Sequence, residues 1–259
     1  MRVRNILLAV LVALAAAGAG WYVHDQQSAA RLERDLEHRY GVLVSTGTLE
    51  LPGRRSNASY RKVPWFNRLA ALRALERDLD RYRPAFLKQH LRRIYVFRTL
   101  TIKGESYGGT YDTERQAVYI AASWLGDNGR DPEAMGFHHE LSSLLIHGYP
   151  EAFPVSDWRA LNPAGFRYRF QRSTARNLSS GRLDLAGNEQ TYERGFLSDY
   201  GTLSVEDDMN TFAQYVIGKL VRLRELESRY PRIAAKAAFI RRGLDEIGPW
   251  RAAAPGSAR

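Results

Sequence analysis

A histidine and a glutamate stand next to each other in the segment GFHHELSSLLIH, residues 136–147. On a helix, two histidines four residues apart share a face and can bind one zinc ion. A glutamate directly after the first histidine can then activate a metal-bound water. His139 and Glu140 occupy the first two of these positions, but Ser143 stands where the second histidine would be. A serine hydroxyl is a poor zinc ligand beside imidazole or carboxylate.

The neighbouring histidines do not replace the absent one. His147 lies eight residues after His139, about 12 Å along a helix that rises roughly 1.5 Å per residue. Zinc–nitrogen bonds are only about 2.0–2.1 Å long, so these two side chains cannot share an ion on an unbroken helix. His138 points about 100° away from His139. Because the chain has no cysteine, a further metal ligand would have to be His, Asp or Glu from elsewhere.

A second polar cluster follows far downstream, in GFLSDYGTLSVEDDMN, residues 195–210. Tyr200, Glu206 and Asp207 are its residues with chemical potential. The same cluster also suits the beginning of a helix, because acids are stabilised in a first turn and Ser204 with Asp207 resembles a capping box. Each of these residues, and His139 and Glu140 as well, taken alone fits a purely structural role.

The intervening sequence predicts the elements that position these residues. Apolar spacing predicts helices, and runs of β-branched and aromatic residues predict strands. We expect helices over residues 28–39, 65–91 with a kink at Pro84, 136–147, 206–229 and 233–247. We expect strands over residues 41–52, 92–102 and 110–122, with loops over 53–62 and 127–135. The segment 148–195 shows little periodicity and is predicted to be a functional loop region.

The amino terminus is typical of an exported protein. Arg2 and Arg4 precede an uncharged apolar run over residues 6–23. Such a run reads either as a signal peptide, with small-residue cleavage sites between Ala15 and Ala19, or as an anchor in the inner membrane. Trp21 and Tyr22 at its end resemble interfacial aromatics. We therefore expect residues 1–27 to target the chain and the rest to lie in the periplasm or outside the cell.

Composition places the remainder in one globular domain. The 259 residues are long enough for a sizeable core, and mixed helix and strand signals predict an α+β fold over residues 28–250, followed by a disordered tail, 251–259. The net charge of +10 is compatible with anionic lipids or cell-wall polymers. No nucleic-acid-binding motif accompanies it, so a nucleic-acid partner is not expected. The oligomeric state is not predicted.

Three segments together resemble a known family. GFHHELSSLL, preceded by AVYIAAS and followed by GFLSDYGTLSVEDDMNTFA, is similar to bacterial zinc-binding metallopeptidases of the gluzincin type, which are distantly similar to the catalytic domain of anthrax lethal factor. The resemblance covers roughly residues 65–220. It implies a zincin-like α+β fold in which a small mixed sheet, with an edge strand, packs on helices.

The resemblance also implies roles. His139 matches the first zinc ligand, Glu140 the general base, and Tyr200 the tyrosine that steadies the tetrahedral intermediate; the third ligand matches Asp207, or its neighbour Glu206. Ser143 departs from the family pattern at the second ligand. The implied function is a zinc-dependent peptidase, exported or membrane-tethered, acting on a peptide or cell-wall substrate. The alternative is a metal-free zincin-like module that grips an extended peptide or cell-wall strand by β-augmentation. A structural envelope protein without a ligand is a third possibility.

Overall fold

The computed structural model describes residues 2–48, 50, 58–125, 136–169 and 187–250. The predicted α+β class is confirmed. Within these residues the helices are α1 (Arg2–Tyr40), α2 (Trp65–Leu79), α3 (Pro84–His90), α4 (Gly136–Gly148), α5 (Val155–Ala160), α7 (Glu189–Glu193), α8 (Val205–Gly218), α9 (Leu220–Arg229) and α10 (Pro231–Ile247). The strands are β1 (Leu43–Ser45), β2 (Ala58–Arg61), β3 (Arg93–Phe97), β4 (Thr99–Ile102), β5 (Glu105–Tyr107), β6 (Gly109–Asp112) and β7 (Ala117–Ala121). Short 3-10 turns are η1 (Ala122–Leu125) and η3 (Tyr200–Thr202).

A four-stranded mixed sheet forms the centre of the fold. Its order is β1-β3-β7-β6, with β1, β3 and β7 parallel and β6 antiparallel to β7. Every residue of β7 is buried, as expected for a strand covered on both faces. Helix α4 packs against β6 and β7. The predicted small mixed sheet on helices is therefore present, and β6 is one of its two edge strands within the described residues, with β1 at the other edge. The single strand predicted over residues 110–122 is instead a hairpin of β6 and β7, because the chain turns between Asp112 and Ala117.

A second sheet, of order β2-β4-β5, was not predicted. The sequence suggested one strand over residues 92–102 and a loop over 53–62. Instead the chain leaves the first sheet at Arg98, which is exposed, and enters the second as β4. β2 then pairs antiparallel with β4. A break of one residue between two apolar strands leaves no signal in the alternation of residue types, which is why the prediction merged them.

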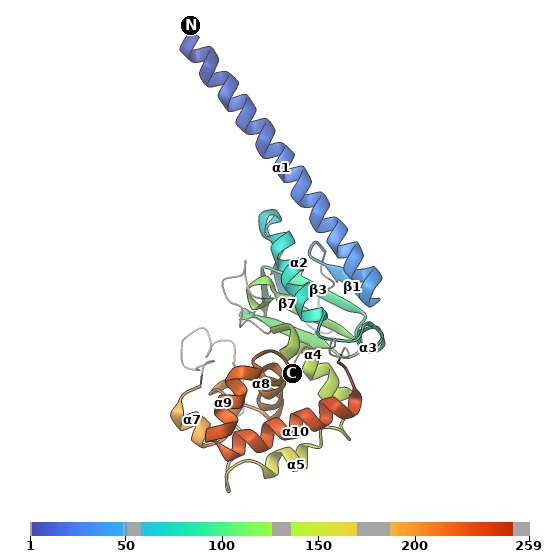
Figure 1. Cartoon of the computed structure of the whole chain (residues 1–259), viewed down its shortest axis with the longest axis vertical. Coiled ribbons are helices and arrows are strands. Elements are labelled where there is room, and N and C mark those ends of the chain that lie inside the picture. Colours follow the sequence, from blue (N-terminus) through green and yellow to red (C-terminus); the bar gives the residue numbers. More distant parts are fainter. Residues whose placement is uncertain (1, 49, 51–57, 126–135, 170–186, 251–259) are drawn as a thin grey trace.

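Helix α1 is much longer than the helix predicted over residues 28–39, because it runs without a break from Arg2 to Tyr40. Figure 1 shows it projecting from the body, with its last turns beside α2. The predicted interruption at Pro84 is correct: α2 ends at Leu79 and Pro84 begins α3, where its fixed φ and missing N–H are tolerated. Over the residues that the structure describes, no helix combines the length and apolar character needed to cross a membrane.

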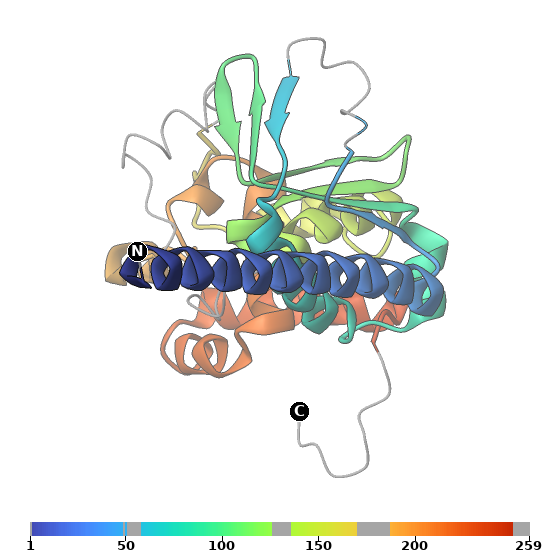
Figure 2. The same ribbon diagram turned by 90° about the horizontal axis from the view of Figure 1, so that it is seen from above.

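The carboxyl-terminal helices form a layer opposite the strands. Viewed from above, α1 lies across the molecule with the strands on one side and α9 and α10 on the other (Figure 2). The helix predicted over 206–229 is divided at Lys219 into α8 and α9. Gly248 caps α10 in the left-handed conformation, φ 59°, which favours glycine. The segment 148–195 contains α5 and α7, which were not predicted. Three segments lie outside the described residues: the predicted loop 127–135, residues 170–186 and the predicted tail 251–259.

Candidate functional site

Helix α4 carries the histidine–glutamate pair into the interior. Its residues from Gly136 to Ile146 are all buried. Its first residue is a glycine because the helix begins against the sheet: a Cβ at position 136 would lie 2.6 Å from a side-chain atom of Ile120 and 2.7 Å from one of Trp124. This close approach fixes the position of the two turns that follow, where His139 and Glu140 lie.

His139 faces helix α8. Its side chain is nearly buried, with 7% exposed, and its Nδ1 lies 3.3 Å from Oε1 of Gln214. An amide oxygen only accepts hydrogen bonds, so this contact assigns the ring hydrogen to Nδ1 and leaves Nε2 with a lone pair. The ring centroid lies 5.7 Å from that of Tyr200. A metal-binding imidazole is oriented in the same manner, by a second partner on its other nitrogen.

Tyr200 and Asp207 meet beside this imidazole. Ser204 caps α8: the backbone N–H of Asp207 donates to its hydroxyl at 3.0 Å, and the hydroxyl donates to the Asp207 carboxylate at 2.7 Å. The Tyr200 hydroxyl also hydrogen-bonds this carboxylate. The predicted capping box at Ser204 is thus half present, and the cap aims Asp207 at Tyr200 and His139.

Burial controls the ionisation of this group. It raises the pKa of the Tyr200 phenol well above its ordinary value, and the nearby carboxylate of Asp207 adds to the increase. It also raises the pKa of Asp207, although the hydrogen bonds from Tyr200 and Ser204 oppose this. The pKa of His139 is lowered by burial against the opposing charge of Asp207. At neutral pH the site therefore holds a neutral imidazole and a protonated phenol.

Glu140 lies against the edge strand β6. Its side chain is 7% exposed, and a Cβ at Gly109 would lie 2.5 Å from its Oε1 and 2.8 Å from its Cγ. Only glycine at the first residue of β6 leaves room for this carboxylate. Glu140 is also close enough to Tyr200 to raise the pKa of the phenol electrostatically. The structure therefore brings His139, Glu140, Tyr200 and Asp207 into one neighbourhood; their roles stay predictions.

The position of the absent second histidine is filled. Ser143 is 1% exposed, and its hydroxyl accepts a hydrogen bond of 2.7 Å from Nδ2 of Asn210. The hydroxyl of Ser142 lies 2.8 Å from the side-chain oxygen of the same asparagine. Asn210 is one helical turn beyond Asp207, so a serine–asparagine bridge between α4 and α8 stands directly beside the candidate site.

These residues do not fit the zinc site that the sequence predicted. A zinc ion in a catalytic site takes three protein ligands, whereas His139 and Asp207 offer one imidazole and one carboxylate. Within the described ranges of the chain, no group of three or more His, Asp or Glu is arranged to hold a metal ion. The serine–asparagine bridge occupies the direction from which a second imidazole would approach.

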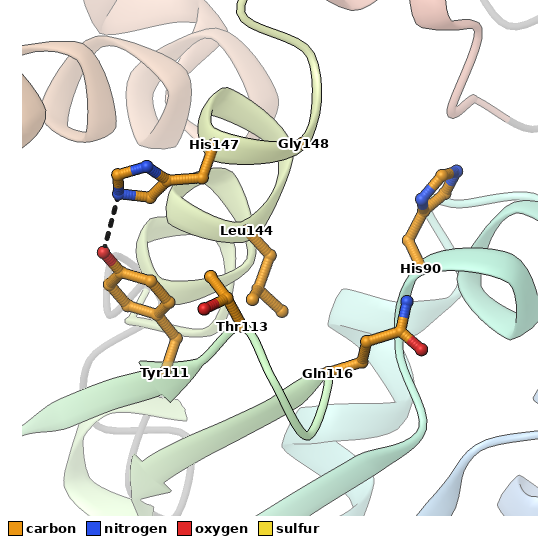
Figure 3. A pocket seen from close by; sticks show the side chains of 7 residues that line it. All are labelled: His90, Tyr111, Thr113, Gln116, Leu144, His147 and Gly148. Atoms are coloured by element: carbon orange, nitrogen blue, oxygen red, sulfur yellow. Dashed lines mark hydrogen bonds between the residues drawn. The ribbon is translucent and has the colours of Figure 1, made fainter.

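Glu206, the other predicted ligand, is near enough to His139 and Tyr200 to raise their pKa values electrostatically, but its ion-pair partner is a different histidine. Its Oε2 lies 3.6 Å from Nε2 of His147 at the end of α4. The same nitrogen lies 2.9 Å from the Tyr111 hydroxyl, and the two rings stack with centroids 5.7 Å apart. Figure 3 shows the contact between this tyrosine on β6 and His147. α4 is unbroken, so His147 belongs to this separate group, as its distance from His139 predicted.

Two hollows flank His147. One, of about 500 Å3, is bounded by polar and apolar groups of α3, the β6–β7 hairpin and α4 (Figure 3): His90, Tyr111, Thr113, Gln116, Leu144, His147 and Gly148. The other, of about 450 Å3, has a more apolar lining: Ile146, His147, Pro150, Phe153, Val155, Val205, Glu206 and Met209. Neither is lined by His139 or Glu140. A ligand in these hollows would lie next to the site rather than in it.

A buried ion pair lies next to the candidate site along α8. The side chains of Asp208 and Lys236 are both fully buried, and Nζ of Lys236 lies 2.7 Å from Oδ2 of Asp208. The same carboxylate oxygen accepts hydrogen bonds from Tyr168 at 2.7 Å and from Trp158 at 3.0 Å, and the ammonium lies 3.8 Å from the ring centroid of Phe196. Burial raises the pKa of Asp208 to about 6 against the opposing charge of Lys236. This network joins α8 to α5 and α10.

The sequence interpretation did not identify the partners on α8. Asn210 and Gln214 follow Asp207 after three and seven residues, which places all three on one face of a helix. That polar face in an otherwise apolar helix was the available signal. His138 was correctly predicted not to join His139: its Nδ1 lies 2.7 Å from the Tyr82 hydroxyl, in the core.

Comparison with solved structures shows a similar fold. The structure superposes on a crystal structure of a "putative zinc-binding metallo-peptidase" from Bacteroides caccae ATCC 43185 with a TM-score of 0.51. The sequences are 15% identical, and the match covers 86% of each chain. Neither a protein-family model nor a curated protein matches the sequence. The match shows that this chain shares its fold with that protein.

Proposed function

We propose that this protein binds an extended peptide, or a peptide-like cell-wall strand, on the β6 side of a metallopeptidase-like fold without a zinc ion at His139. The observation that carries the proposal is the position of β6. Within the described residues β6 and β1 are the two edge strands of the four-stranded sheet, and β6 is the one beside the candidate site. Its first residue, Gly109, packs against Glu140, and Tyr111 lies beside His147. An extended peptide can add to the edge of a sheet through its main chain.

Side chains along β6 provide places for the ligand's side chains. The first hollow is bounded by Tyr111 and Thr113 of the β6–β7 hairpin. The second, apolar hollow begins on the other side of His147. In strand addition, main-chain hydrogen bonds supply affinity and alternate side chains enter pockets. The two hollows therefore support selection among peptides by side chains near the His147 end of β6.

The serine–asparagine bridge supports a site at His139 without zinc. Asn210 donates to Ser143 at the place of the second imidazole, and both side chains are buried. A buried and satisfied pair of this kind is costly to open. In this proposal Tyr200 and Glu140 have no catalytic role.

N-methylated peptides test this mode of binding. A peptide selected from a random library against the full-length chain is resynthesised with one backbone amide methylated at a time. Because alternate amides of an added strand face the sheet edge, methylation should abolish binding at every second position and leave the other positions near wild type. Uniform tolerance of methylation, or no peptide ligand in the library, would contradict the proposal.

A zinc-dependent peptidase is the second candidate. One observation favours it: Gln214 holds Nδ1 of His139, so that Nε2 keeps its lone pair, while Asp207 and Tyr200 stand beside the ring. Zinc would need a further ligand that these residues do not supply. Elemental analysis of the purified protein decides between the candidates. Near-stoichiometric zinc that disappears in His139→Ala would support the peptidase, and a zinc-free protein unaffected by chelator would support the binding protein.

The proposal includes export to the periplasm or the exterior, with the apolar run over residues 6–23 as signal or inner-membrane anchor. Arg2 and Arg4 before that run support it. Fusion of an enzyme active only outside the cytoplasm to the carboxyl terminus tests this part separately.

A further inference from the structure

A group of aromatic side chains lies exposed where α1 meets α2. Trp21 and Tyr22 of α1 contact Trp65 with ring centroids 5.1 Å and 4.9 Å apart, and Trp65 contacts Phe66 at 5.5 Å. Their exposed fractions are 56%, 45%, 37% and 55% in chain order. These four exposed aromatic side chains, of which Trp65 contacts the other three, form what we call the aromatic patch. A contiguous exposed apolar patch of this kind marks an interaction surface.

Basic side chains border the aromatic patch. Phe66 and Arg98 line the same hollow of about 310 Å3, together with Thr99 and Ser123. Arg98 is exposed, and its backbone N–H donates to the carbonyl oxygen of Arg61 at 2.8 Å. Arg61 and the next residue, Lys62, are exposed as well. Arg98 therefore shares a hollow with Phe66, and Arg61 and Lys62 add exposed basic residues at the neighbouring end of β2.

We propose that the aromatic patch and its basic border are a contact surface for a bilayer that contains anionic lipids. Tryptophan and tyrosine combine an apolar ring with a polar group and concentrate at membrane–water interfaces. Lysine and arginine beside them are attracted to anionic head groups. Trp21 and Tyr22 lie near the end of the uncharged apolar run over residues 6–23, and this continuity argues for lipid rather than for a protein as the occupant.

This inference is independent of the peptide-binding proposal, but it adds an orientation. In Figure 1, α1 and the amino-terminal end of α2 lie at one end of the molecule and α5 and α10 at the other. Contact through Trp65 and Phe66 would hold the α8–α10 layer away from the bilayer. The folded body would then be docked on the membrane surface rather than tethered loosely to it.

Because the chain contains no cysteine, single labels can test the contact in the full-length protein. An environment-sensitive fluorophore is attached to Ser123→Cys, in the hollow that Phe66 and Arg98 line. The labelled protein is mixed with vesicles of phosphatidylcholine and phosphatidylglycerol that also contain a quencher lipid. The control label is Val221→Cys on α9, whose native side chain is 77% exposed. We expect quenching several-fold stronger at position 123 than at position 221. Equal quenching at the two positions would overturn the proposal.

Two sets of variants separate the contributions. Trp65→Ser with Phe66→Ser should reduce quenching at position 123 to the control level, whereas Val155→Ser, at another exposed apolar side chain, should not. Arg98→Glu should reduce quenching only when phosphatidylglycerol is present. This variant still tests the lipid contact if the aromatic double variant does not fold. Unchanged quenching in these variants, or a dimer that forms through the patch without lipid, would contradict the lipid assignment.

Discussion

Gly109 shows at the scale of one residue how the site depends on close packing. Alanine there would place a Cβ 2.5 Å from Oε1 of Glu140, so strand and carboxylate would have to separate. We expect Gly109→Ala to cost about 1–3 kcal/mol of stability and to weaken peptide binding about tenfold, which corresponds to about 1.4 kcal/mol. Gly47→Ala is the matched control, since a Cβ at 47 meets nothing within 4 Å. Denaturant unfolding and peptide titration measure both effects.

The serine–asparagine bridge gives a second residue-scale prediction. Ser143→His alone should not restore zinc, because Asn210 occupies the space that the imidazole needs. Ser143→His combined with Asn210→Ala should bind zinc with His139 and Asp207. At free zinc one hundred times the dissociation constant, the gain in stability should be about 2.7 kcal/mol. Chelator-sensitive melting of the double variant checks this, and the same variant with His139→Ala should lose the effect.

The imidazole of His139 predicts a pH dependence. Burial lowers its pKa below the ordinary value of 6.5, so between these two values the unfolded chain binds more protons than the folded chain. Its contribution to stability is therefore complete above pH 6.5 and is lost as the pH falls from 6.5 to the folded pKa. His139→Gln should flatten this part of the stability profile, which denaturant unfolding at a series of pH values measures. Equal profiles for wild type and His139→Gln would contradict this assignment.

At the scale of the element, α8 has a different task on each face. Asp207, Asn210 and Gln214 face α4, whereas Asp208 binds Lys236 of α10. Removing the partner of a buried charge costs about 3–5 kcal/mol, so Lys236→Met should destabilise the protein by about that amount. Lys236→Met with Asp208→Asn should recover much of the loss, because no buried charge is left unpaired. Thermal unfolding of the three proteins tests the pair, and a double variant no more stable than Lys236→Met would refute it.

The sequence could predict α4 and the first turn of α8 because both carry local signals. Apolar spacing marks α4, and Ser204 with the acids after it marks the start of α8. It could not predict the bridge from Ser143 to Asn210, since this contact joins residues 67 positions apart. The same limit explains the second sheet: pairing of β2 with β4 is decided by tertiary contacts, not by the local pattern of residues 53–62.

At the scale of the whole molecule, the segment after α10 packs against the connection between α2 and α3. Trp250 stacks on Tyr82 with centroids 5.9 Å apart, and the Tyr82 hydroxyl reaches His138 on α4. We expect Trp250→Ala to lower stability by about 1–2 kcal/mol. Trp21→Ala is the control of equal size change at a side chain that is 56% exposed. Unfolding in denaturant distinguishes them, and equal losses would contradict this role of Trp250.

The general architecture could be predicted from the sequence, but its extent could not. The α+β class follows from the order of strand-like and helix-like segments, whereas the edge strand was expected only from the family resemblance. The continuous helix from Arg2 to Tyr40 was divided in the prediction, because a targeting segment and a domain helix were treated as separate units. Nothing in the residue types between them marks a break.

The exposed rings at the junction of α1 and α2 have a consequence for processing of the chain. A peptidase cutting after Ala19 would release the leading segment and leave Trp21 as the second residue of the mature protein. Tyr22 and the rings on α2 would also remain. The aromatic patch would therefore be present whether the leading segment is cleaved or retained. A protein that has lost this segment could still bind a lipid surface through the patch.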